Sequence, residues 1–523
     1  MIEFELKFQI PPARRAAVRA FVAGNKRPAL PPIHLQAIYF DTPQRLLAAS
    51  GIALRVRREG AVWVQTLKGA AADGLGREEC NHTLQDATSA GTPPEVDPQR
   101  HRGLPLGDRL IDLLASNPAE RLQCSYRSDV KRLRRQLKTR FGSVELAFDE
   151  GHLLSTTDRL AICELEIELI NGHPLAVIDV ARRWALRFGL WLDIRSKAER
   201  GDLLARGLSV SPPRSDIAPA ALHEQHPPRI ALQASIASVR NPILANASQI
   251  ASGRFDAEHL HQLRVMLRRL RVILRLFGDD PAAAELGLPL VEPAAELFRG
   301  LGTGRDRSVL ASQVSTDIEA ALRQAGEAGP LPVPGVDDVD ARMVELVRAS
   351  ASQSLLLDLV QVTLPAVVDV HTAHDDKLSP AEPTHPGDKS ARPVRLRKLL
   401  LSRLGRWQRA IARDADQFVE LDETARHQLR KHVKRLRYAI EAAKGLLDER
   451  KVKAIRKPLK QAQQVLGEIN DLATALGAFN RPDAGHLAWF ARGWLIARQR
   501  ALVDAGVEPM QRLARATRKK KLR

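Results

Sequence analysis

The sequence contains little cysteine and no long apolar run, and both absences narrow the class of protein. Its three cysteines, Cys80, Cys124 and Cys163, lie far apart and form no CxxC pair. This spacing argues against a disulfide framework or a zinc site and fits a reducing cytoplasm. No uninterrupted apolar run approaches the roughly 18 residues of a membrane span, and residues 1–5 lack the basic and apolar regions of a signal peptide. We therefore expect a cytoplasmic protein without a membrane partner.

Aromatic residues are also scarce, at 4% of the chain, whereas basic residues are abundant. The 80 lysines and arginines exceed the 61 aspartates and glutamates and give a formal net charge of +19. Such an excess predicts a polyanionic partner, which is nucleic acid, an anionic membrane or polyphosphate. Nucleic acid is the weaker alternative, because single-strand binders usually stack bases on exposed aromatic side chains.

The 523 residues exceed the size of a single core and divide by pattern into domains. Residues 1–207 contain short runs of alternating apolar and polar residues, which predict strands. The helices predicted within this domain lie at about 13–23, 106–115 and 174–188. A proline-rich linker at 208–221 resists helix and strand alike. Amphipathic helical patterns follow over 222–515, and a basic tail at 516–523 is expected to be a disordered arm.

Several predicted strands group their charged residues on one face, because alternate residues of a strand share a face. The charged faces carry Glu3, Glu5 and Lys7; Arg55 and Arg57; Lys68; Glu145 and Asp149; and Glu164, Glu166 and Glu168. A solvated face explains any one such strand. The recurrence of the layout with complementary charges instead favours a barrel with a polar lumen, whose apolar outer surface is covered by helices.

Three carboxylates in a row on one strand repel one another, and a divalent cation relieves that repulsion. Ligation by oxygen alone indicates Mg²⁺ or Mn²⁺ rather than zinc. Clustered arginine and lysine suit phosphate oxygens, arginine through its planar fork. The predicted lumen is therefore a candidate site for a metal-bound polyphosphate.

These residues resemble the CYTH, or triphosphate tunnel metalloenzyme, family. Its ExExK signature is present as Glu3-x-Glu5-x-Lys7. The supporting matches are Tyr39-Phe40-Asp41-Thr42, Leu54-Arg55-Val56-Arg57, Thr66-Leu67-Lys68-Gly69, Phe148-Asp149-x-Gly151, Glu164-Leu165-Glu166-Ile167-Glu168 and Ser196-Lys197-x-Glu199-Arg200-Gly201. In this order, over about 200 residues, the matches are specific. They are most similar to bacterial inorganic triphosphatases in which a helical domain follows.

The resemblance implies an eight-stranded antiparallel tunnel that hydrolyses or cyclises triphosphates with a divalent metal. The implied metal ligands are Glu3, Glu5, Glu164 and Glu166, with Glu168 and Asp149 as further candidates. The implied triphosphate ligands are Arg55, Arg57, Lys68 and Lys197, with Arg127 and Arg132 as candidates. The last two have opposite parity on one strand, so one of them should face away. Lys7 would position or help to activate the attacking water, next to Glu3 and Glu5.

The helical domain contains an internal duplication. The block His261-Gln-Leu-Arg264-Val-Met-Leu-Arg268-Arg269-Leu-Arg271 aligns with His427-Gln-Leu-Arg430-Lys-His-Val-Lys434-Arg435-Leu-Arg437 at a shift of 166. Downstream, Leu301-Gly302-x-x-Arg305-Asp306 aligns with Leu466-Gly467-x-x-Asn470-Asp471 at a shift of 165. Two blocks at nearly one offset indicate two copies, at about 222–370 and 390–515.

Each copy places a histidine and several basic residues on one helix face. The first stripe is His261, Arg264, Arg268, Arg271 and Arg275; the second is His427, Arg430, Lys434 and Arg437. A solvated face is the plain explanation, but like charges at this spacing cost stability when acidic partners are lacking. The repeated spacing therefore favours an anion-binding groove. A role of the histidines as metal ligands is disfavoured by the basic residues around them.

These stripes resemble the CHAD domain, a conserved-histidine α-helical domain, over about residues 222–515. The resemblance implies two pseudo-symmetric four-helix bundles that bind inorganic polyphosphate, a property compatible with association with polyphosphate granules. The sequence thus predicts an α+β multidomain hydrolase that cleaves inorganic triphosphate to diphosphate and phosphate. Three alternatives stay open: a non-catalytic polyphosphate scaffold, an adenylate cyclase or organic triphosphatase, and nucleic-acid binding, since phosphate stripes do not read bases.

Overall fold

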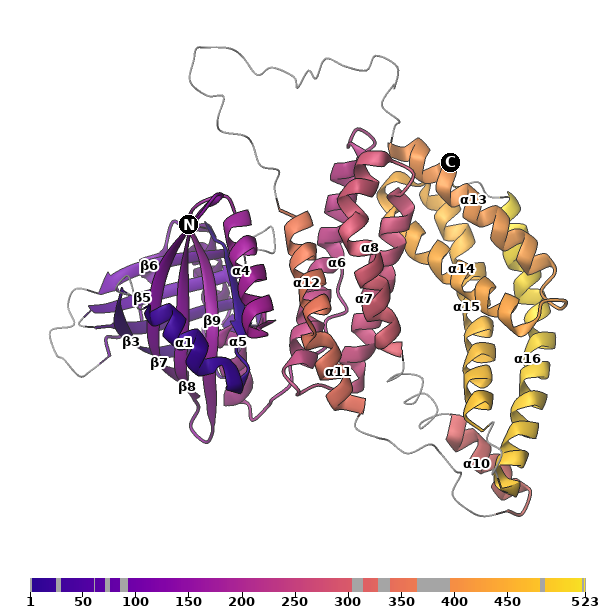
Figure 1. Ribbon diagram of the computed structural model, residues 1–523, viewed down its shortest axis with the longest axis horizontal. Coiled ribbons are helices and arrows are strands. Elements are labelled where there is room, and N and C mark those ends of the chain that lie inside the picture. The colour runs from indigo at the N-terminus through magenta and orange to yellow at the C-terminus, as the bar shows by residue number, and fades with distance from the viewer. Residues whose placement is uncertain are drawn as a thin grey trace, which may run out of the picture. The chain divides into compact units, whose positions relative to one another are not determined.

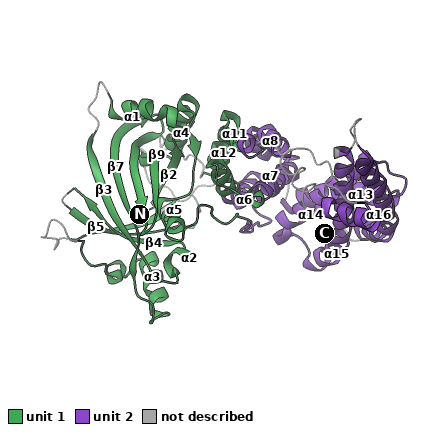
Figure 2. Cartoon of the chain, turned by 90° about the horizontal axis from the view of Figure 1, so that it is seen from below, with its two compact units in different colours: residues 1–214, 243–259, 344–364 green, residues 215–242, 260–343, 365–523 purple. Residues whose placement is uncertain are grey.

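The computed structural model describes residues 2–24, 30–60, 62–70, 76–84, 93–302, 314–327, 339–364, 396–479, 485–519 and 522 (Figure 1). The chain divides into two compact units (Figure 2). The first comprises residues 1–214, 243–259 and 344–364, and the second comprises residues 215–242, 260–343 and 365–523. The strand-rich unit therefore includes two helical segments that follow the proline-rich linker in the sequence.

The first unit is built on one antiparallel sheet. Its strands are β1 (Ile2–Glu3), β2 (Glu5–Gln9), β3 (Leu30–Asp41), β4 (Ile52–Glu59), β5 (Val62–Ala70), β6 (Arg77–Leu84), β7 (Gln123–Thr139), β8 (Gly142–Leu154), β9 (Arg159–Gly172) and β10 (Trp191–Leu192). Their order is β1-β6-β5-β4-β3-β7-β8-β9-β2-β10.

Residues 2–9 close this sheet on itself. β1 pairs with β6, and β2, which follows after Phe4 alone, pairs with β9. The Phe4 carbonyl accepts a 3.0 Å hydrogen bond from the Leu169 N–H, so pairing continues through the interruption. With β1 and β2 counted as one, the described residues contain nine strands, and the predicted number of eight is wrong. The additional strand is β10, whose two residues are too few to produce a visible alternation.

Helices cover the apolar outer surface of the sheet. α1 (Arg15–Ala23) and α4 (Leu175–Phe188) contact β8, while α2 (Leu46–Ala49) and α3 (Pro105–Ala115) contact β4 and β5 respectively. Leu54 and Leu67 point outward and pack against Leu106 and Leu110 of α3. The three helices predicted from sequence in this domain are therefore confirmed.

The short helix α5 (Lys197–Ala205) fills one end of the lumen. Its Leu204 packs on Val130, Leu153 and Ile162, which lie on the same faces of β7, β8 and β9 as the charged residues. Gly201 lets the helix approach β7 closely, because a Cβ at this position would lie 2.2 Å from the Tyr126 ring. This apolar contact thus holds the motif around Lys197 next to the motif around Asp149.

The helical region comprises α6 (Pro228–Ala251), α7 (Ala257–Phe277), α8 (Pro281–Gly300), α10 (Ser315–Gln324), α11 (Val339–Arg348), α12 (Ser350–Val362), α13 (Leu396–Asp416), α14 (Glu423–Ala442), α15 (Glu449–Ala478) and α16 (His486–Lys519). In the second copy, α13, α14, α15 and α16 pack as a four-helix bundle, with α13 also contacting α16. Aspartates accept hydrogen bonds at the N-termini of α8, α14 and α15, as expected for N-caps. α16 continues to Lys519, so the predicted disordered arm at 516–523 is wrong for its first four residues.

Among the described residues, no helix combines the length and the apolar composition needed to cross a membrane.

Candidate functional site: a charged tunnel and two basic stripes

The register of three neighbouring strands, β2, β9 and β8, arranges charged residues in rows across the lumen. The rows are Glu5–Glu168–Glu145, Lys7–Glu166–Ala147 and Gln9–Glu164–Asp149. Like charges directly opposite one another destabilise a sheet. The first row contains three carboxylates and no base, so it concentrates negative charge at one level of the tunnel.

The third row, with Glu166, forms a buried carboxylate cluster, in which oxygen atoms of Asp149, Glu164 and Glu166 lie within 4.8 Å of one another. The Lys197 ammonium is in the middle of this cluster, 2.6 Å from Asp149, 2.5 Å from Glu164 and 2.7 Å from Glu166. Arg132 donates to both oxygens of Asp149 at 2.7 Å and pairs with Glu166. These two cations offset most of the negative charge of the three carboxylates, and Lys197 contacts all three.

The neighbouring bases keep Glu164 and Glu166 ionised. Burial alone would raise the pKa of Glu164, but Arg200, Lys197 and Lys7 lower it to about 2. Burial would also raise the pKa of Glu166, but Lys197 and Arg132 hold it well below the usual range. Glu164 and Glu166 therefore remain charged across the physiological pH range.

A second group, the acidic row, consists of Glu3, Glu5, Glu79, Glu145 and Glu168. Within it, Lys68 lies 3.0 Å from Glu3 and 2.5 Å from Glu79. Burial raises the pKa of Glu168, and Glu5 and Glu145 contribute in the same direction. The carboxylates of the acidic row thus oppose the ionisation of Glu168, whereas the bases around Lys197 favour the ionisation of Glu166.

Glu3 and Glu79 share a proton within the acidic row. Burial raises the pKa of Glu3 to about 8, with help from the Glu79 and Glu5 carboxylates and against the opposing effect of Lys68. Burial would also raise the pKa of Glu79, but the hydrogen bond with Glu3 and the charge of Lys68 lower it to about 2. Near neutral pH one proton is therefore held between the two carboxylates, mainly on Glu3.

Arg55 and Arg57 of β4 face the same lumen. Arg55 donates to the Tyr39 hydroxyl at 3.2 Å and lies 4.0 Å from Glu79, and Arg57 pairs with Glu59. Arg132 opposes the charge of both guanidinium groups electrostatically, which places the three arginines near one another. The predicted phosphate ligands of β4 and β7 thus converge.

Lys7 lies beside the buried carboxylate cluster. Its side chain is buried, and its ammonium donates to the Arg195 carbonyl at 3.4 Å. Its charge also contributes to lowering the pKa values of Glu164 and Glu166. The three residues of the ExExK motif thus reach both acidic groups: Glu3 and Glu5 reach the acidic row, and Lys7 reaches the buried cluster.

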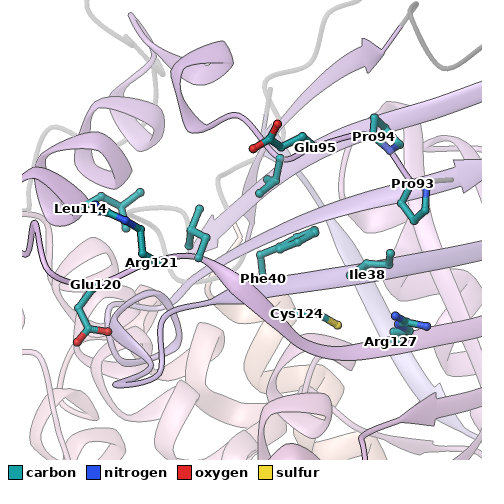
Figure 3. A pocket seen from close by; sticks show the side chains of 12 residues that line it. Ile38, Phe40, Pro93, Pro94, Glu95, Leu114, Glu120, Arg121, Cys124 and Arg127 are labelled. Atoms are coloured by element: carbon teal, nitrogen blue, oxygen red, sulfur yellow. The ribbon is translucent and has the colours of Figure 1, made fainter.

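Arg127 does not share the face of Arg132 and is removed from the candidate phosphate ligands. Its exposed side chain lines a separate pocket of about 560 Å³ on the outer surface, with Ile38, Phe40 and Cys124 (Figure 3). The reason is the parity of β7, because residues an odd number apart on a regular strand point to opposite faces.

Two lumen residues were missed from the sequence. Arg200 pairs with Glu164, and Glu79 joins Lys68 to Glu3. Arg200 lies within a motif that was recognised, but helical position 200 has no period-two signal. Glu79 follows Glu78 directly, and only the pairing of Lys68 with Glu79 in the β5–β6 register identifies which of the two faces inward.

A third group of potential ligands lies on the outer side of β6. Cys80 Sγ is 3.2 Å from His82 Nε2 and 3.3 Å from His101 Nδ1, although sequence spacing suggested no such cluster. Gln65, fixed by two hydrogen bonds to the Asp97 backbone, directs its amide nitrogen at His101 Nε2. His101 Nδ1 must then carry the proton, and burial lowers the pKa of His101 to about 4. A metal ligand normally directs its second N–H at an acceptor, so the arrangement favours a hydrogen-bonded cluster.

In the helical region, the first basic stripe is ordered around one aromatic ring. The guanidinium carbons of Arg264, Arg268 and Arg271 lie 4.9, 5.2 and 4.9 Å from the centre of the Phe298 ring of α8. Cation–π contacts of this kind hold arginines without neutralising them. The stripe on α7 therefore keeps its positive charge while its side chains are oriented.

The second stripe, on α14, contacts the second repeated block of its own copy. His427 Nδ1 lies 2.6 Å from Asn470 Oδ1, and Arg430 lies 3.8 Å from Asp471. In the first copy, Arg264 Nη1 would lie 3.0 Å from a Cβ at Gly302. The two repeated blocks are thus adjacent in both copies, although Arg305 and Asp306 lie outside the described residues.

The two stripes meet through arginines that sequence reasoning did not include. Burial lowers the pKa of Arg435, and the charges of Arg275, Arg271 and Arg403 lower it further. Glu441 reaches across to Arg269 at 2.8 Å and lies 3.6 Å from Arg437. Asp279 pairs with Arg403 at 2.7 Å, so the positive charge that gathers between α7, α13 and α14 is compensated only in part.

The donors of the tunnel fit a hard divalent cation. The acidic row provides carboxylate oxygen alone and more negative charge than Lys68 balances, which suits Mg²⁺ or Mn²⁺. Glu3 holds a proton near neutral pH, and its carboxylate could bind a cation in exchange for that proton.

Comparison with known proteins gives two family matches: the CYTH domain over residues 1–201 and the CHAD domain over residues 234–480. The chain thus carries a CYTH domain followed by a CHAD domain, and the resemblance predicted from the motifs is confirmed. A curated relative, an inorganic triphosphatase of Haemophilus influenzae, is 28% identical over 205 residues, which are 39% of this chain and 54% of the relative. The match thus spans about half the length of that relative.

Two solved structures are also similar. The CHAD domain of the plant Ricinus communis is 21% identical, with 58% of this chain and 96% of that one covered and a TM-score of 0.37. A putative adenylyl cyclase from Hippeastrum, described as having a dominant triphosphatase activity, is 18% identical, with 40% and 97% covered and a TM-score of 0.29.

Proposed function

We propose that the tunnel hydrolyses inorganic triphosphate to diphosphate and phosphate with Mg²⁺ or Mn²⁺. The observation that supports this most is the convergence of Arg55, Arg57 and Arg132 on a closed lumen. Other strands of the same lumen carry rows of carboxylates. The similarity to an inorganic triphosphatase agrees with it. The bases suit the terminal and bridging oxygens of a short polyphosphate, and the acidic row suits the metal that accompanies it.

In this proposal, Glu3 and Glu5 hold the divalent cation together with Glu168, and Glu164 and Glu166 keep Lys197 and Arg132 in place for the phosphates. The metal, when bound, neutralises phosphate oxygens and polarises the phosphorus that is attacked. Lys7 orients the attacking water toward that phosphorus. The arginines stabilise negative charge as it moves to the leaving diphosphate, so catalysis depends mainly on position and electrostatics.

Phosphate release tests this function. Wild type and Glu5→Gln should be compared on tripolyphosphate, ATP and thiamine triphosphate, with Mg²⁺ or Mn²⁺. We expect release from tripolyphosphate by wild type and a loss of about 10²-fold or more in the variant, since a metal ligand is removed. Equal release by both proteins would contradict the proposed metal site. Absence of release by wild type would favour the alternative of a non-catalytic polyphosphate-binding scaffold.

We further propose that the basic stripes of the CHAD domain bind inorganic polyphosphate. The support is the crowding of like charges around Arg435, together with the ordering of the first stripe on Phe298. Binding of long-chain polyphosphate should be measured in competition with DNA for wild type and for a variant in which His261, Arg264 and Arg268 are alanine. Unchanged affinity in that variant would remove the groove assignment, and preference for DNA would restore the nucleic-acid alternative.

A further inference from the structure

The segment 191–195 joins the helical region to the ExExK strand. Trp191 and Leu192 pair with Gln9 and Phe8 of β2, and the Asp193 N–H donates to the Lys7 carbonyl at 2.9 Å. The Arg195 carbonyl then accepts from the Lys7 ammonium. The same short segment therefore contacts both the backbone and the side chain of Lys7.

Arg195 is fixed by bonds that leave one guanidinium nitrogen for a partner outside this segment. Its Nε and Nη2 donate to the two oxygens of Asp193 at 2.9 Å each, and its backbone N–H donates to Asp193 at 3.1 Å. The same Asp193 accepts from Gln9, which also donates to Glu164. The segment is thus linked to the buried carboxylate cluster as well as to Lys7.

The remaining nitrogen, Arg195 Nη1, donates to Gln249 Oε1 at 3.1 Å. Gln249 is 1% exposed and lies on α6, after the linker and inside the CHAD match. Its neighbour Ser248 accepts from the Ile194 N–H at 3.1 Å and lies 3.4 Å from the Leu192 carbonyl. α6 therefore bonds to this segment at three of its five residues.

We infer that Gln249 is a positioning residue for Lys7, through Arg195, so that a helix of the CHAD domain forms part of the tunnel's support. The role of Lys7 in hydrolysis rests on the proposed function. A buried guanidinium that loses an acceptor must move or admit water, because an unsatisfied buried donor is costly. The Arg195 carbonyl moves with it, and displacements of about 1 Å at a reacting group cost about 10²-fold in rate.

The test uses the full chain, with Gln249→Met as the variant that keeps shape and removes the acceptor, and Gln249→Glu as the variant that keeps it. Asn246→Leu is the matched control: Asn246 is equally buried on the same helix but bonds to the backbone of Arg214. With tripolyphosphate and Mg²⁺, we expect kcat to fall 10- to 100-fold in Gln249→Met with KM within about twofold. Gln249→Glu should recover most of kcat, and Asn246→Leu should retain it.

A double-mutant cycle separates positioning from general loss of structure. In a Lys7→Ala background, Gln249→Met should cost no further activity, whereas a full additional loss would overturn the inference. A kcat no lower than that of Asn246→Leu would do the same.

Labelling of Lys7 with an amine reagent, followed by peptide mass spectrometry, gives a readout without catalysis. Lys7 should react faster in Gln249→Met than in wild type or Asn246→Leu, and equal labelling would reject the inference. An inactive wild type would instead contradict the proposed hydrolysis. The labelling of Lys7 would still test the role of Gln249 in that case. Should Gln249→Met not fold, Gln249→Asn, which withdraws the same amide, takes its place.

Discussion

The Lys197 ammonium lies 2.5 Å from a carboxylate oxygen of Glu164, and it bridges from there to Asp149 and Glu166. Removal of this cation by Lys197→Met leaves the three buried carboxylates with Arg132, Arg200 and Lys7 as their basic neighbours. Breaking such a buried pair costs about 3–5 kcal/mol. We expect a decrease of this size in the free energy of unfolding, measured by urea denaturation, together with loss of triphosphate hydrolysis.

The surface pair of Arg19 and Glu150, 3.5 Å apart, provides the control for this measurement. Arg19→Ala should change the free energy of unfolding by less than about 1 kcal/mol, as exposed ion pairs do. Similar losses in both variants would mean that Lys197 contributes only as an ordinary surface charge.

The proton held by Glu3 predicts an unusual pH dependence of stability. Between about pH 4.5 and 8, the folded protein retains this proton while the unfolded chain has released it. Stability therefore decreases as the pH rises through this window, with a slope of at most about 1.4 kcal/mol per pH unit for one proton. Glu3→Gln should flatten that part of the profile, measured by thermal unfolding without divalent cations.

Millimolar Mg²⁺ should oppose the same trend, because the cation competes with the Glu3 proton. We expect a larger increase in melting temperature at pH 8.5 than at pH 6 in wild type, and little difference between the two in Glu3→Gln. A stabilisation that is independent of pH in wild type would place the metal away from Glu3.

The two arginines of β7 provide a direct comparison of the lumen with the outer surface. Arg132→Ala removes a guanidinium that bonds to Asp149 and Glu166, so kcat/KM for tripolyphosphate should fall by about 10²–10³-fold. Arg127→Ala changes only the outer pocket and should stay within about twofold of wild type. Comparable losses in steady-state assays of the two variants would contradict the assignment of faces.

The like charges around Arg435 that would attract an anion also repel one another and reduce stability. The charge of Arg435 is opposed by Arg275, Arg271 and Arg403, so Arg435→Gln should raise the melting temperature by about 2 °C at low ionic strength. The gain should become smaller at high salt, because salt weakens the repulsion among these partly buried charges. The same variant should bind polyphosphate more weakly; unchanged binding with the same gain would make the charge cluster irrelevant to the ligand.

The sequence predicted the charged faces of the tunnel well, because period-two alternation fixes which residues share a face. Glu164, Glu166 and Lys7 accordingly lie together as their parity requires. It could not decide between Arg127 and Arg132, since the register of β7 with β8 depends on pairing with residues about 20 positions away. It also missed Glu79 and Arg200, whose roles depend on cross-strand and helix–strand contacts.

Contacts across the linker were beyond the reach of local patterns. In the sequence, Gln249 lies within an apolar helical segment, and no pattern near it indicates that its partner is Arg195. The basic stripes were predicted from helical spacing, but the meeting of Arg271 with Arg435 depends on how α7 and α14 pack. Long-range packing thus accounts for most of what the sequence left open.

The closure of the sheet by residues 2–9 has a consequence for how the chain folds. This strand pairs with residues 164–168, about 160 positions further along, and with 191–192 beyond them. Closing so long a loop is slow, because chain entropy is lost before these contacts form. Until then, an open sheet with two unpaired edges is exposed to aggregation. Pairing of the segment that carries Glu3, Glu5 and Lys7 is therefore also a slow step in the folding of the domain. The site is assembled only when the sheet closes.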